Sequence, residues 1–294
     1  MGHNMDDEDF QPRRSFIFMP GISPDMYPKA LATGADIVCI DLEDAIAPHH
    51  KADARTKTMA LFATPHGDPD LGSGVERMVR INSLRSIDGM ADIQAVIASP
   101  SPPPALMLPK VASPDEVRGL DELLCEHGLG TRLHVIIETN AGLNACYEIA
   151  QSSRRIDAMF FGGVDMAAEL RASNSWEALL YARSRVVHAA AGAGLDVIDV
   201  PYLDLGDLPG MKVEARAAAA LGFTGKGSIH PKQIPALNAI FAPDPDTVDH
   251  ARRVVDAFAA ADSGLVVLDN KLIEKPVLRT MHRILRIAER IAAR

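Results

Sequence analysis

The stretches LHVIIE (133–138) and DAMFFGGVD (157–165) are apolar, and each ends at a carboxylate, Glu138 in the first and Asp165 in the second. A short apolar run bounded by turn residues predicts a buried strand, and strands buried on both faces belong to parallel sheets covered by helices. The carboxyl ends of such strands are where ligands bind in α/β folds. Either residue alone could simply cap the following helix. Because the two occupy equivalent positions, the pair predicts a cation site, with Mg²⁺ as the candidate ion.

Strand-like runs recur along the chain, with amphipathic helical patterns between them. Eight such alternations predict a (β/α)₈ TIM barrel with α/β topology. The competing fold is a doubly wound open sheet, which usually has a glycine-rich dinucleotide turn after its first strand, and none is visible here. The expected strands are 15–19, 36–41, 77–81, 105–109, 133–138, 157–162, 196–200 and 222–227. The expected helices include 24–32, 50–62, 87–97, 114–127 and 210–221.

The two ends of the chain differ from the barrel pattern. Residues 1–13 are polar and acidic, and we expect them to form a mobile tail without the apolar core of a secretory signal. The barrel domain is expected over 14–243, where APDPDTV interrupts the pattern. Residues 244–294 exceed what a barrel needs. They predict a C-terminal helical extension that serves as a lid over the barrel, as an oligomer contact, or as both.

The composition is that of a soluble globular enzyme. Hydrophobic residues make up 47% and charged residues 23% of 294, and no apolar run approaches the roughly 18 to 20 residues that span a bilayer. The cysteines Cys39, Cys125 and Cys146 have no metal-type spacing, which predicts reduced thiols in a cytoplasmic protein. The net charge of −9 argues against a nucleic-acid partner.

A second group of acids follows the second expected strand. The sequence DLEDA places Asp41, Glu43 and Asp44 at the same end of the barrel as the first pair. Arg80, within the apolar strand RMVRIN, is the expected partner, because a charge in a buried strand is costly unless it is paired. Two interpretations stay open: a structural salt bridge to Glu43 or Asp44, or a fork for a substrate carboxylate or oxyanion.

Further cations follow later strands. Lys110 comes after the fourth strand, where it is either a site cation or solvated. The turn GKGSIHP (225–231) contains Lys226 and His230 after the last strand. Barrel loops in this position often bind phosphate-type anions, which favours an anion site. The alternative for His230 is a helix-entry residue with a structural hydrogen bond.

The chain contains a series of longer motifs, which are RSFIFMPGISPDMYPKALATGADIVCIDLEDAIAPHHKADAR, VRIN, LPKV, IIETNAGL, FFGGVDMAAEL and GFTGKGSIHPKQI. They resemble those of the citrate lyase β-subunit-like family within the HpcH/HpaI aldolase/citrate lyase superfamily, of the malyl-CoA or citramalyl-CoA lyase type. They run in the family's order from Arg14 to about Ile234. Members are (β/α)₈ barrels, commonly trimeric or hexameric, that need Mg²⁺ and cleave or form carbon–carbon bonds in thioesters such as citryl-, malyl- and citramalyl-CoA.

The resemblance implies a role for individual residues. Glu138 and Asp165 are implied ligands of Mg²⁺, and Arg80 is an implied contact of the substrate's oxygen groups. Glu43 and Asp44 are implied to support the waters of the metal. The implied substrate and CoA contacts are Arg14, Lys29, Lys110, Lys226, Ile229, His230 and Pro231.

The C-terminal segment resembles the lid of longer members, where a neighbouring subunit closes the site and brings an acid near the α-carbon of the thioester. The lid pattern of the family is similar to Asp-Gly-Lys-Met-Ile-Asp-x-Pro. Here the segment is DNKLIEKP (269–276), so that Asn270, Leu272 and Glu274 differ from the pattern. Glu274 keeps the carboxylate on an arm one methylene longer and is the candidate acid/base.

The sequence thus predicts a Mg²⁺-dependent acyl-CoA lyase with retro-Claisen chemistry, assembled as a homotrimer or homohexamer with lid exchange. A thioesterase acting on malyl-CoA at the same site is one alternative. A CoA-independent hydroxy-ketoacid aldolase is another, although GKGSIHP and the long C-terminal segment argue against it. The intact residues Glu138, Asp165 and Arg80 argue against an inactive binding protein. The residues leave open which acyl group is the substrate.

Overall fold

The computed structural model describes residues 11–63, 72, 74–261 and 264–292. Among these, contacts separate two compact units, one over 13–238 and one that comprises 11–12 and the described residues from 239 to 292. The boundary between the two units after residue 238 therefore falls five residues before the predicted end of the barrel domain at 243. Residues 1–10 of the predicted tail lie outside the described part of the chain.

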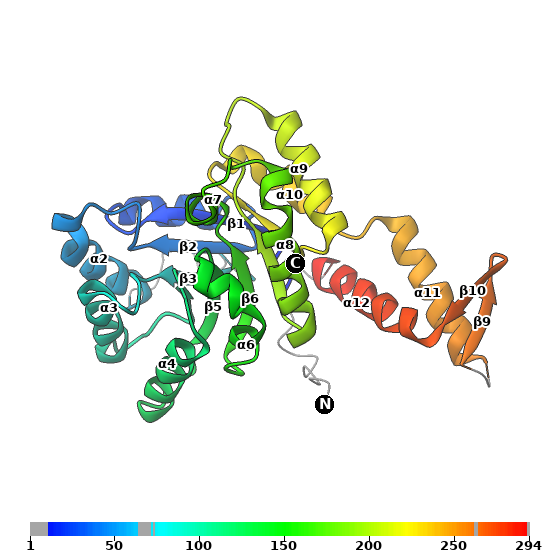
Figure 1. The fold of residues 1–294 in the computed structure, drawn as a ribbon, viewed down its shortest axis with the longest axis horizontal. Coiled ribbons are helices and arrows are strands. Elements are labelled where there is room, and N and C mark those ends of the chain that lie inside the picture. Colours follow the sequence, from blue (N-terminus) through cyan, green and yellow to red (C-terminus); the bar gives the residue numbers. More distant parts are fainter. Residues whose placement is uncertain (1–10, 64–71, 73, 262–263, 293–294) are drawn as a thin grey trace. The chain divides into compact units, whose positions relative to one another are not determined.

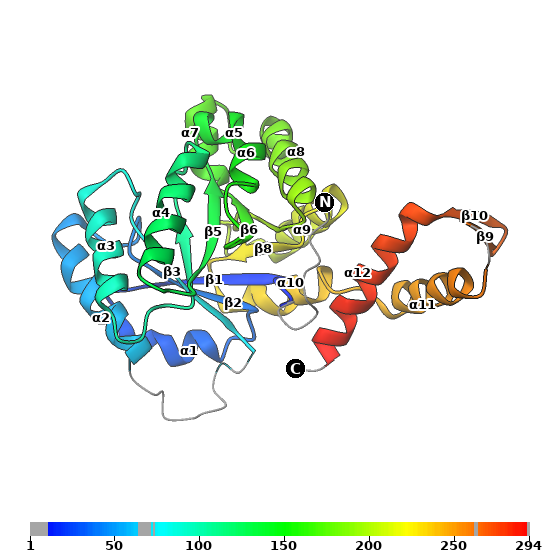
Figure 2. The ribbon, with the colours of Figure 1, turned by 90° about the horizontal axis from the view of Figure 1, so that it is seen from below.

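The first unit is a closed barrel of eight parallel strands, in which β1 is hydrogen-bonded to both β2 and β8 (Figures 1 and 2). This closure confirms the predicted barrel and excludes the open sheet. The strands are β1 (Ser15–Pro20), β2 (Ile37–Asp41), β3 (Glu76–Arg80), β4 (Ala105–Leu108), β5 (Arg132–Ile137), β6 (Ile156–Phe161), β7 (Asp196–Asp199) and β8 (Gly225–Ser228).

The predicted start of the eighth strand at Gly222 is wrong. Gly222 instead ends a helix in the left-handed region, with φ 115°, and β8 begins at Gly225. Glycine adopts this conformation without the steric cost of a Cβ, which is why it commonly follows the last turn of a helix. The segment GFTGKG therefore combines a helix end with a short strand.

Helices follow the strands and surround the barrel (Figure 1). The expected helices are present. The longest helix of this unit, α8, was not among those named from the sequence, because its buried face includes several alanines and the charged Arg183 and so forms no clear apolar stripe. The helices of this unit are α1 (Tyr27–Leu31), α2 (Lys51–Ala63), α3 (Ile87–Ala98), α4 (Pro114–Glu126), α5 (Asn140–Asn144), α6 (Cys146–Ala150), α7 (Gly163–Leu170), α8 (Trp176–Ala193), α9 (Leu208–Leu221) and α10 (Ile234–Ile240), the last of which continues past residue 238. The 3₁₀ turns are η1 (Pro24–Met26), η2 (Pro48–His50) and η3 (Pro231–Gln233).

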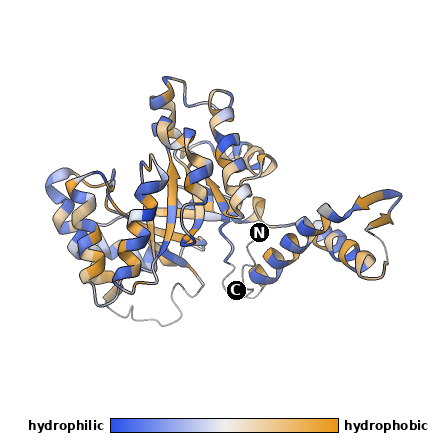
Figure 3. Cartoon of the chain, turned by 60° about the horizontal axis from the view of Figure 1, so that its bottom comes forward, coloured by the Kyte–Doolittle hydropathy of each residue, from blue (hydrophilic) through white to orange (hydrophobic). Residues whose placement is uncertain are grey.

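The barrel strands supply the core. Figure 3 shows them in the orange of apolar residues, whereas the surrounding helices alternate between polar and apolar faces. Strands β2 and β4 are buried at every position, since one face packs inside the barrel and the other against helices. A central cluster inside the barrel consists of Phe16, Ile37, Cys39, Met78, Ala105, Met107, Ile136, Ala158, Phe160 and Ile198.

The second unit contains two helices and a β-hairpin, so the predicted helical extension is only partly helical. The segment LVVLDNKLIE has strand-forming residues on both sides of a two-residue turn. Its two halves pair with each other as an antiparallel hairpin. Its turn residues Asp269 and Asn270 have φ of 52° and 59°, the left-handed conformation that hairpin turns require and that Asp and Asn tolerate. The elements are α11 (Pro245–Ala259), β9 (Leu265–Leu268), β10 (Lys271–Glu274) and α12 (Lys275–Ala292). None of the helices in the described residues combines the length and apolar character needed to cross a membrane.

Candidate active site at the carboxyl end of the barrel

Glu138 lies directly after β5, and Asp165 lies in the first turn of α7, which follows β6. The side chain of Glu138 is buried, and its Oε1 accepts a hydrogen bond of 2.8 Å from the backbone N–H of Lys110. Its other oxygen lies against Gly162, where a Cβ atom would be only 2.4 Å from Oε2. The carboxylate is therefore held between the end of β4 and the end of β6.

Negative charge accumulates around this carboxylate. Burial raises the pKa of Glu138, and the neighbouring charges of Glu43 and Asp165 act in the same direction, so that the pKa lies at about 8. A buried carboxyl group beside two other acids favours either a proton or a cation. Carboxylate oxygens are the ligands that Mg²⁺ prefers, so the donor set of Glu138 and Asp165 fits the predicted ion.

Arg80 is the central cation of this end of the barrel. Its Nε and Nη2 donate to the two oxygens of Asp41 at 2.8 and 2.7 Å, and its Nη1 lies 3.1 Å from Glu43. The predicted salt bridge of Arg80 to Glu43 is therefore present, and Asp44 is a looser contact at 3.7 Å. Asp41 is a further partner that was not predicted, and its position opposite Arg80 in the β2–β3 register brings the two side chains together.

The guanidinium of Arg80 stays charged. Burial acts to lower its pKa, but the hydrogen bonds and charges of Asp41 and Glu43 hold the pKa above its ordinary value. The ring of Phe18 lies 4.5 Å from the guanidinium carbon, which adds a cation–π contact. Arg80 therefore presents a fixed positive charge at the barrel mouth.

Lys110 contacts two acids with different parts of its structure. Its backbone N–H donates to Glu138, while its Nζ lies 2.6 Å from Oε1 of Glu43 and 3.4 Å from Oδ1 of Asp44. The residue has φ 55°, a left-handed conformation that is uncommon outside glycine and is typical of functional sites. The sequence predicted the ammonium group as a site cation but gave no signal for the backbone role.

A buried network supports the DLEDA loop from behind. The Nζ of Lys51 donates to the carbonyl oxygens of Leu42 at 2.8 Å and Glu43 at 2.6 Å, and to Oδ1 of Asn82 at 2.7 Å. The side-chain amide of Asn82 in turn donates to Asp92. This support was not predicted from the sequence, although a lysine at a helix start just after the acidic loop is a usable signal.

The structure corrects two predicted substrate contacts. Arg14 lies at the amino end of the barrel, where its Nε and Nη2 each donate to Asp36 at 2.8 Å. Lys226 is fully buried and binds Asp199 at 2.5 Å and Glu214, on α9, at 2.7 Å. The side chain of Arg14 is thus committed to Asp36 at the amino end. Strand alternation turns Lys226 outward toward the helix layer, where it is committed to Asp199 and Glu214 rather than to the interior of the mouth.

The remaining predicted contacts lie near the surface. Lys29 is exposed in the last turn of α1, and Ile229 is 39% exposed after β8. His230 caps η3: its Nδ1 accepts from the backbone N–H of Lys232 at 3.1 Å, which is the helix-entry alternative. Pro231 begins the same turn. A hollow of about 170 Å³ beside it is lined by Asp204, Leu205, Leu208, His230, Lys232 and Gln233.

Glu274 is exposed at the end of β10 in the second compact unit. Its side chain is thus not buried by other residues of its own unit. The predicted role as acid/base stays a prediction.

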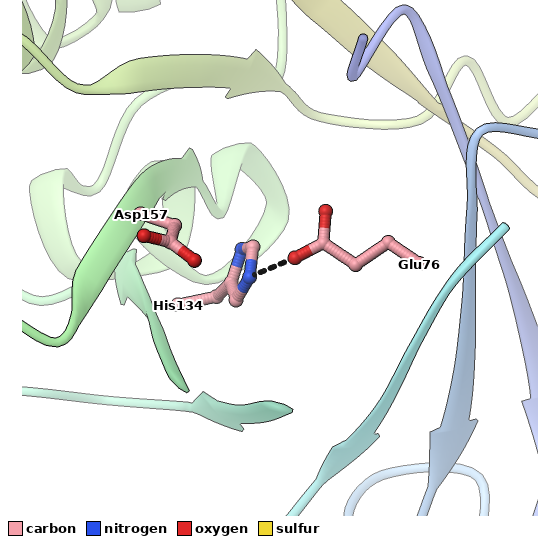
Figure 4. A group of neighbouring side chains, drawn as sticks. All are labelled: Glu76, His134 and Asp157. Carbon is pink, nitrogen blue, oxygen red and sulfur yellow. Dashed lines mark hydrogen bonds and ion pairs between the residues drawn. The ribbon is translucent and has the colours of Figure 1, made fainter. Parts of the chain in front are cut away.

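A second group of potential metal ligands occupies the opposite end of the barrel. Figure 4 shows Glu76, His134 and Asp157, whose ligand atoms lie within 4.8 Å of one another. Arg13 already supplies the positive charge: its Nε lies 2.6 Å from Glu76 and its Nη1 3.0 Å from Asp196. Although burial favours the neutral form, the charges of His134 and Arg13 hold the pKa of Glu76 well below its ordinary value. This cluster is a compensated ion-pair network, and Arg13 belongs to it rather than to the predicted tail.

The sequence agrees with this geometry, because residues 14–231 match the HpcH/HpaI aldolase/citrate lyase family. The chain belongs to this family. Among family relatives, it is 32% identical to the mitochondrial citramalyl-CoA lyase of Mus musculus over 96% of the chain and 88% of that protein. It is 35% identical to citrate lyase subunit beta of Escherichia coli K12 over 94% of the chain and 93% of that protein.

The similarity to one solved structure covers the residues of both compact units. The CitE protein of Mycobacterium tuberculosis, in complex with magnesium, acetoacetate and coenzyme A, is 30% identical and has a TM-score of 0.75. The match covers 96% of this chain and 99% of that one. The predicted family and the predicted barrel are both confirmed.

Proposed function

We propose that this member of the HpcH/HpaI family is a Mg²⁺-dependent acyl-CoA lyase. It cleaves or forms a carbon–carbon bond in a β-hydroxyacyl-CoA thioester such as malyl-, citramalyl- or citryl-CoA. The observation that carries the proposal is the buried carboxylate of Glu138 at the barrel mouth, which is held by the backbone N–H of Lys110 at 2.8 Å and packed against Gly162. The nearby charges of Glu43 and Asp165 act to raise its pKa, which favours a bound cation. A lyase and a lyase subunit among its relatives, and a related structure with magnesium and coenzyme A, support it.

In this proposal Glu138 and Asp165 hold the ion, which when bound supplies a Lewis acid for the oxygens of the substrate. The fixed charge of Arg80 lies at the same mouth and stabilises the negative charge that develops on the thioester carbonyl during bond cleavage. Lys110 keeps Glu138 oriented through its backbone and neutralises Glu43 through its side chain. Glu274 is the candidate that delivers the proton to the α-carbon.

Product analysis with malyl-CoA tests the reaction. Purified protein with MgCl₂ is expected to yield acetyl-CoA and glyoxylate, whereas free CoA and malate would identify a thioesterase. A panel with citramalyl- and citryl-CoA then identifies the acyl preference, which a pocket sets by about 1–3 kcal/mol per methylene. The Glu138→Gln variant is the control for catalysis by a contaminating enzyme.

We also propose a homotrimer or homohexamer in which the C-terminal unit of one subunit closes the site of a neighbour. The hairpin supports this, since Val267 is 68% and Leu272 62% exposed, which is unusual for apolar strand residues that pack only within their own chain. Mixing Glu138→Gln with Glu274→Gln tests it. Restored activity means that lid and metal site come from different subunits, and no restoration contradicts lid exchange.

A cytoplasmic location is part of the same proposal. The three cysteines, Cys39, Cys125 and Cys146, are all free thiols, and two of them are buried. Unpaired thiols are typical of reducing compartments. Fractionation of the source cells, with detection of the protein by antibody, tests this location.

A further inference from the structure

Four charges of balanced sign meet between the barrel and its helices, and three of them are buried whereas the fourth, Glu214, is partly exposed. Lys226, on β8, is fully buried, and its Nζ contacts Oδ2 of Asp199 at 2.5 Å, Oε1 of Glu214 at 2.7 Å and the carbonyl oxygen of Val200 at 2.7 Å. Arg183, on α8, is also buried, and its Nε donates to the other oxygen of Asp199 at 3.0 Å. Two cations therefore face two carboxylates.

The guanidinium of Arg183 contacts two aromatic rings. Its central carbon is 5.0 Å from the ring centre of Phe161 and 4.7 Å from that of Trp176. Phe161 is the last residue of β6, so its ring is held at the strand end that precedes Gly162, Gly163 and Asp165. The network thus reaches the turn that carries the proposed metal ligand.

A second contact reaches the same turn from β7. A Cβ atom on Gly163 would lie 3.0 Å from Cγ1 of Val200 and 3.1 Å from Cε1 of Phe161, so the first turn of α7 packs closely on both residues. Val200 is fixed through its carbonyl by Lys226, and Phe161 is fixed through its ring by Arg183. The seat of α7 is therefore built from the two residues that the network restrains.

We propose that Lys226, Asp199 and Arg183 are positioning residues that set the placement of Asp165 at the metal site. The proposal rests on the proposed Mg²⁺ function of Asp165. A buried ion-pair network contributes little net stability relative to apolar residues of similar volume, so a gain in folding stability alone does not explain why charges occupy these positions. Placement is what it can supply, because metal ligands must be held within about 0.5 Å of the productive geometry.

The test is the affinity for Mg²⁺ alone, measured by calorimetry on the full chain. The double variant Lys226→Met with Asp199→Asn removes one positive and one negative charge. The remaining pair, Arg183 and Glu214, carries opposite charges, so the net charge of the network stays zero. We expect its Mg²⁺ affinity to fall by about tenfold, the scale of losses when groups that orient a ligand are removed. Its thermal midpoint is expected to stay close to that of the wild type.

A matched control removes an ion pair at the other end of β6. Arg155 and Asp121 pair at 2.5 Å just before that strand begins, far along it from the turn of α7. The double variant Arg155→Met with Asp121→Asn is expected to bind Mg²⁺ as the wild type does. An equal loss in this control would mean that any lost ion pair loosens the site, which overturns the proposal.

A milder variant covers the case in which the double variant does not fold. Arg183→Lys keeps the charge but loses the planar guanidinium that contacts Phe161 and Trp176. A folded Arg183→Lys or double variant that binds Mg²⁺ with wild-type affinity overturns the positioning role. Wild-type protein that binds no Mg²⁺ instead overturns the proposed function itself, so the two failures are distinguishable.

The single tryptophan provides a readout that is independent of activity. Since Trp176 contacts Arg183, the proposal expects Mg²⁺ to change its fluorescence emission in the wild type, with a midpoint equal to the calorimetric one. In the double variant the midpoint is expected to move to about tenfold higher Mg²⁺. Equal midpoints in the two proteins contradict the proposal.

Discussion

The two ends of the barrel both gather carboxylates, but they balance the charge differently. At the amino end, Arg13 lies within ion-pair distance of Glu76, Asp157 and Asp196, and His134 contacts Glu76 as well (Figure 4). At the carboxyl end, two cations, Arg80 and Lys110, face five carboxylates. These are Asp41, Glu43, Asp44, Glu138 and Asp165.

The contrast appears in two glutamates of similar burial. The charges of His134 and Arg13 hold the pKa of Glu76 well below its ordinary value despite its burial. Burial and the charges of Glu43 and Asp165 raise the pKa of Glu138 to about 8. A cluster of acids therefore indicates a cation site only where the chain leaves the charge uncompensated.

The largest difference is expected when one carboxylate is removed at each end of the barrel. Glu138→Gln is expected to abolish measurable Mg²⁺ binding and activity, because loss of a direct ligand must exceed the roughly 10- to 100-fold cost of losing a group around one. Glu76→Gln, the matched change at the amino end, is expected to leave Mg²⁺ affinity unchanged. Calorimetry on both variants measures this, and equal losses would contradict the contrast between the ends.

The next effect concerns stability at the amino end. Arg13→Met leaves Glu76, Asp157 and Asp196 without their shared cation, and breaking a buried ion pair on one side costs about 3–5 kcal/mol of unfolding free energy. Urea unfolding followed by circular dichroism measures the loss. Mg²⁺ affinity should not change if the residual protein is folded. An Arg13→Met variant as stable as the wild type would show that the network does not need its arginine.

A smaller effect is expected from one added methyl group at the mouth. In Gly162→Ala the new Cβ would lie 2.4 Å from Oε2 of Glu138 and displace the carboxylate, which should weaken Mg²⁺ binding by about 10- to 100-fold. The control is Gly119→Ala, in the open middle of α4, where no atom lies within 4 Å of the new methyl. This control is expected to stabilise the protein by about 0.5–1 kcal/mol. If both alanines bind Mg²⁺ equally, the packing of Glu138 on Gly162 does not matter.

The smallest effect is a pH dependence at the amino end. Since the folded pKa of Glu76 lies below its unfolded value of about 4.3, its stabilisation is complete above that pH. It is lost as the pH falls through the folded pKa. The difference in unfolding free energy between the wild type and Glu76→Gln should therefore shrink below about pH 4.3. Urea unfolding at pH 7 and pH 3.5 tests it, and a constant difference would contradict the ion-pair assignment.

The sequence located most of the mouth. Glu138 and Asp165 were predicted from apolar runs that stop at a carboxylate, and Arg80 from a charge inside an apolar strand. Gly162 had a usable signal, because a glycine after a strand often marks a close approach. The backbone role of Lys110 had none, since its N–H becomes a ligand-orienting donor only when β4 and β5 are neighbours.

By itself, the sequence determined the barrel, the family and the end of the barrel that carries the acids. The barrel follows from local periodicity, because the chain repeats its strand pattern eight times, and the acids lie where those strand patterns end. The family follows from the resemblance of the longer motifs. Tertiary structure alone decided which charges pair. Arg14, Arg80, Lys110 and Lys226 all lie in or beside apolar strands, yet only Arg80 and Lys110 reach the mouth. The reason is that the partner of a charge depends on strand register, on the face of the strand and on helices distant in sequence, none of which a local pattern records.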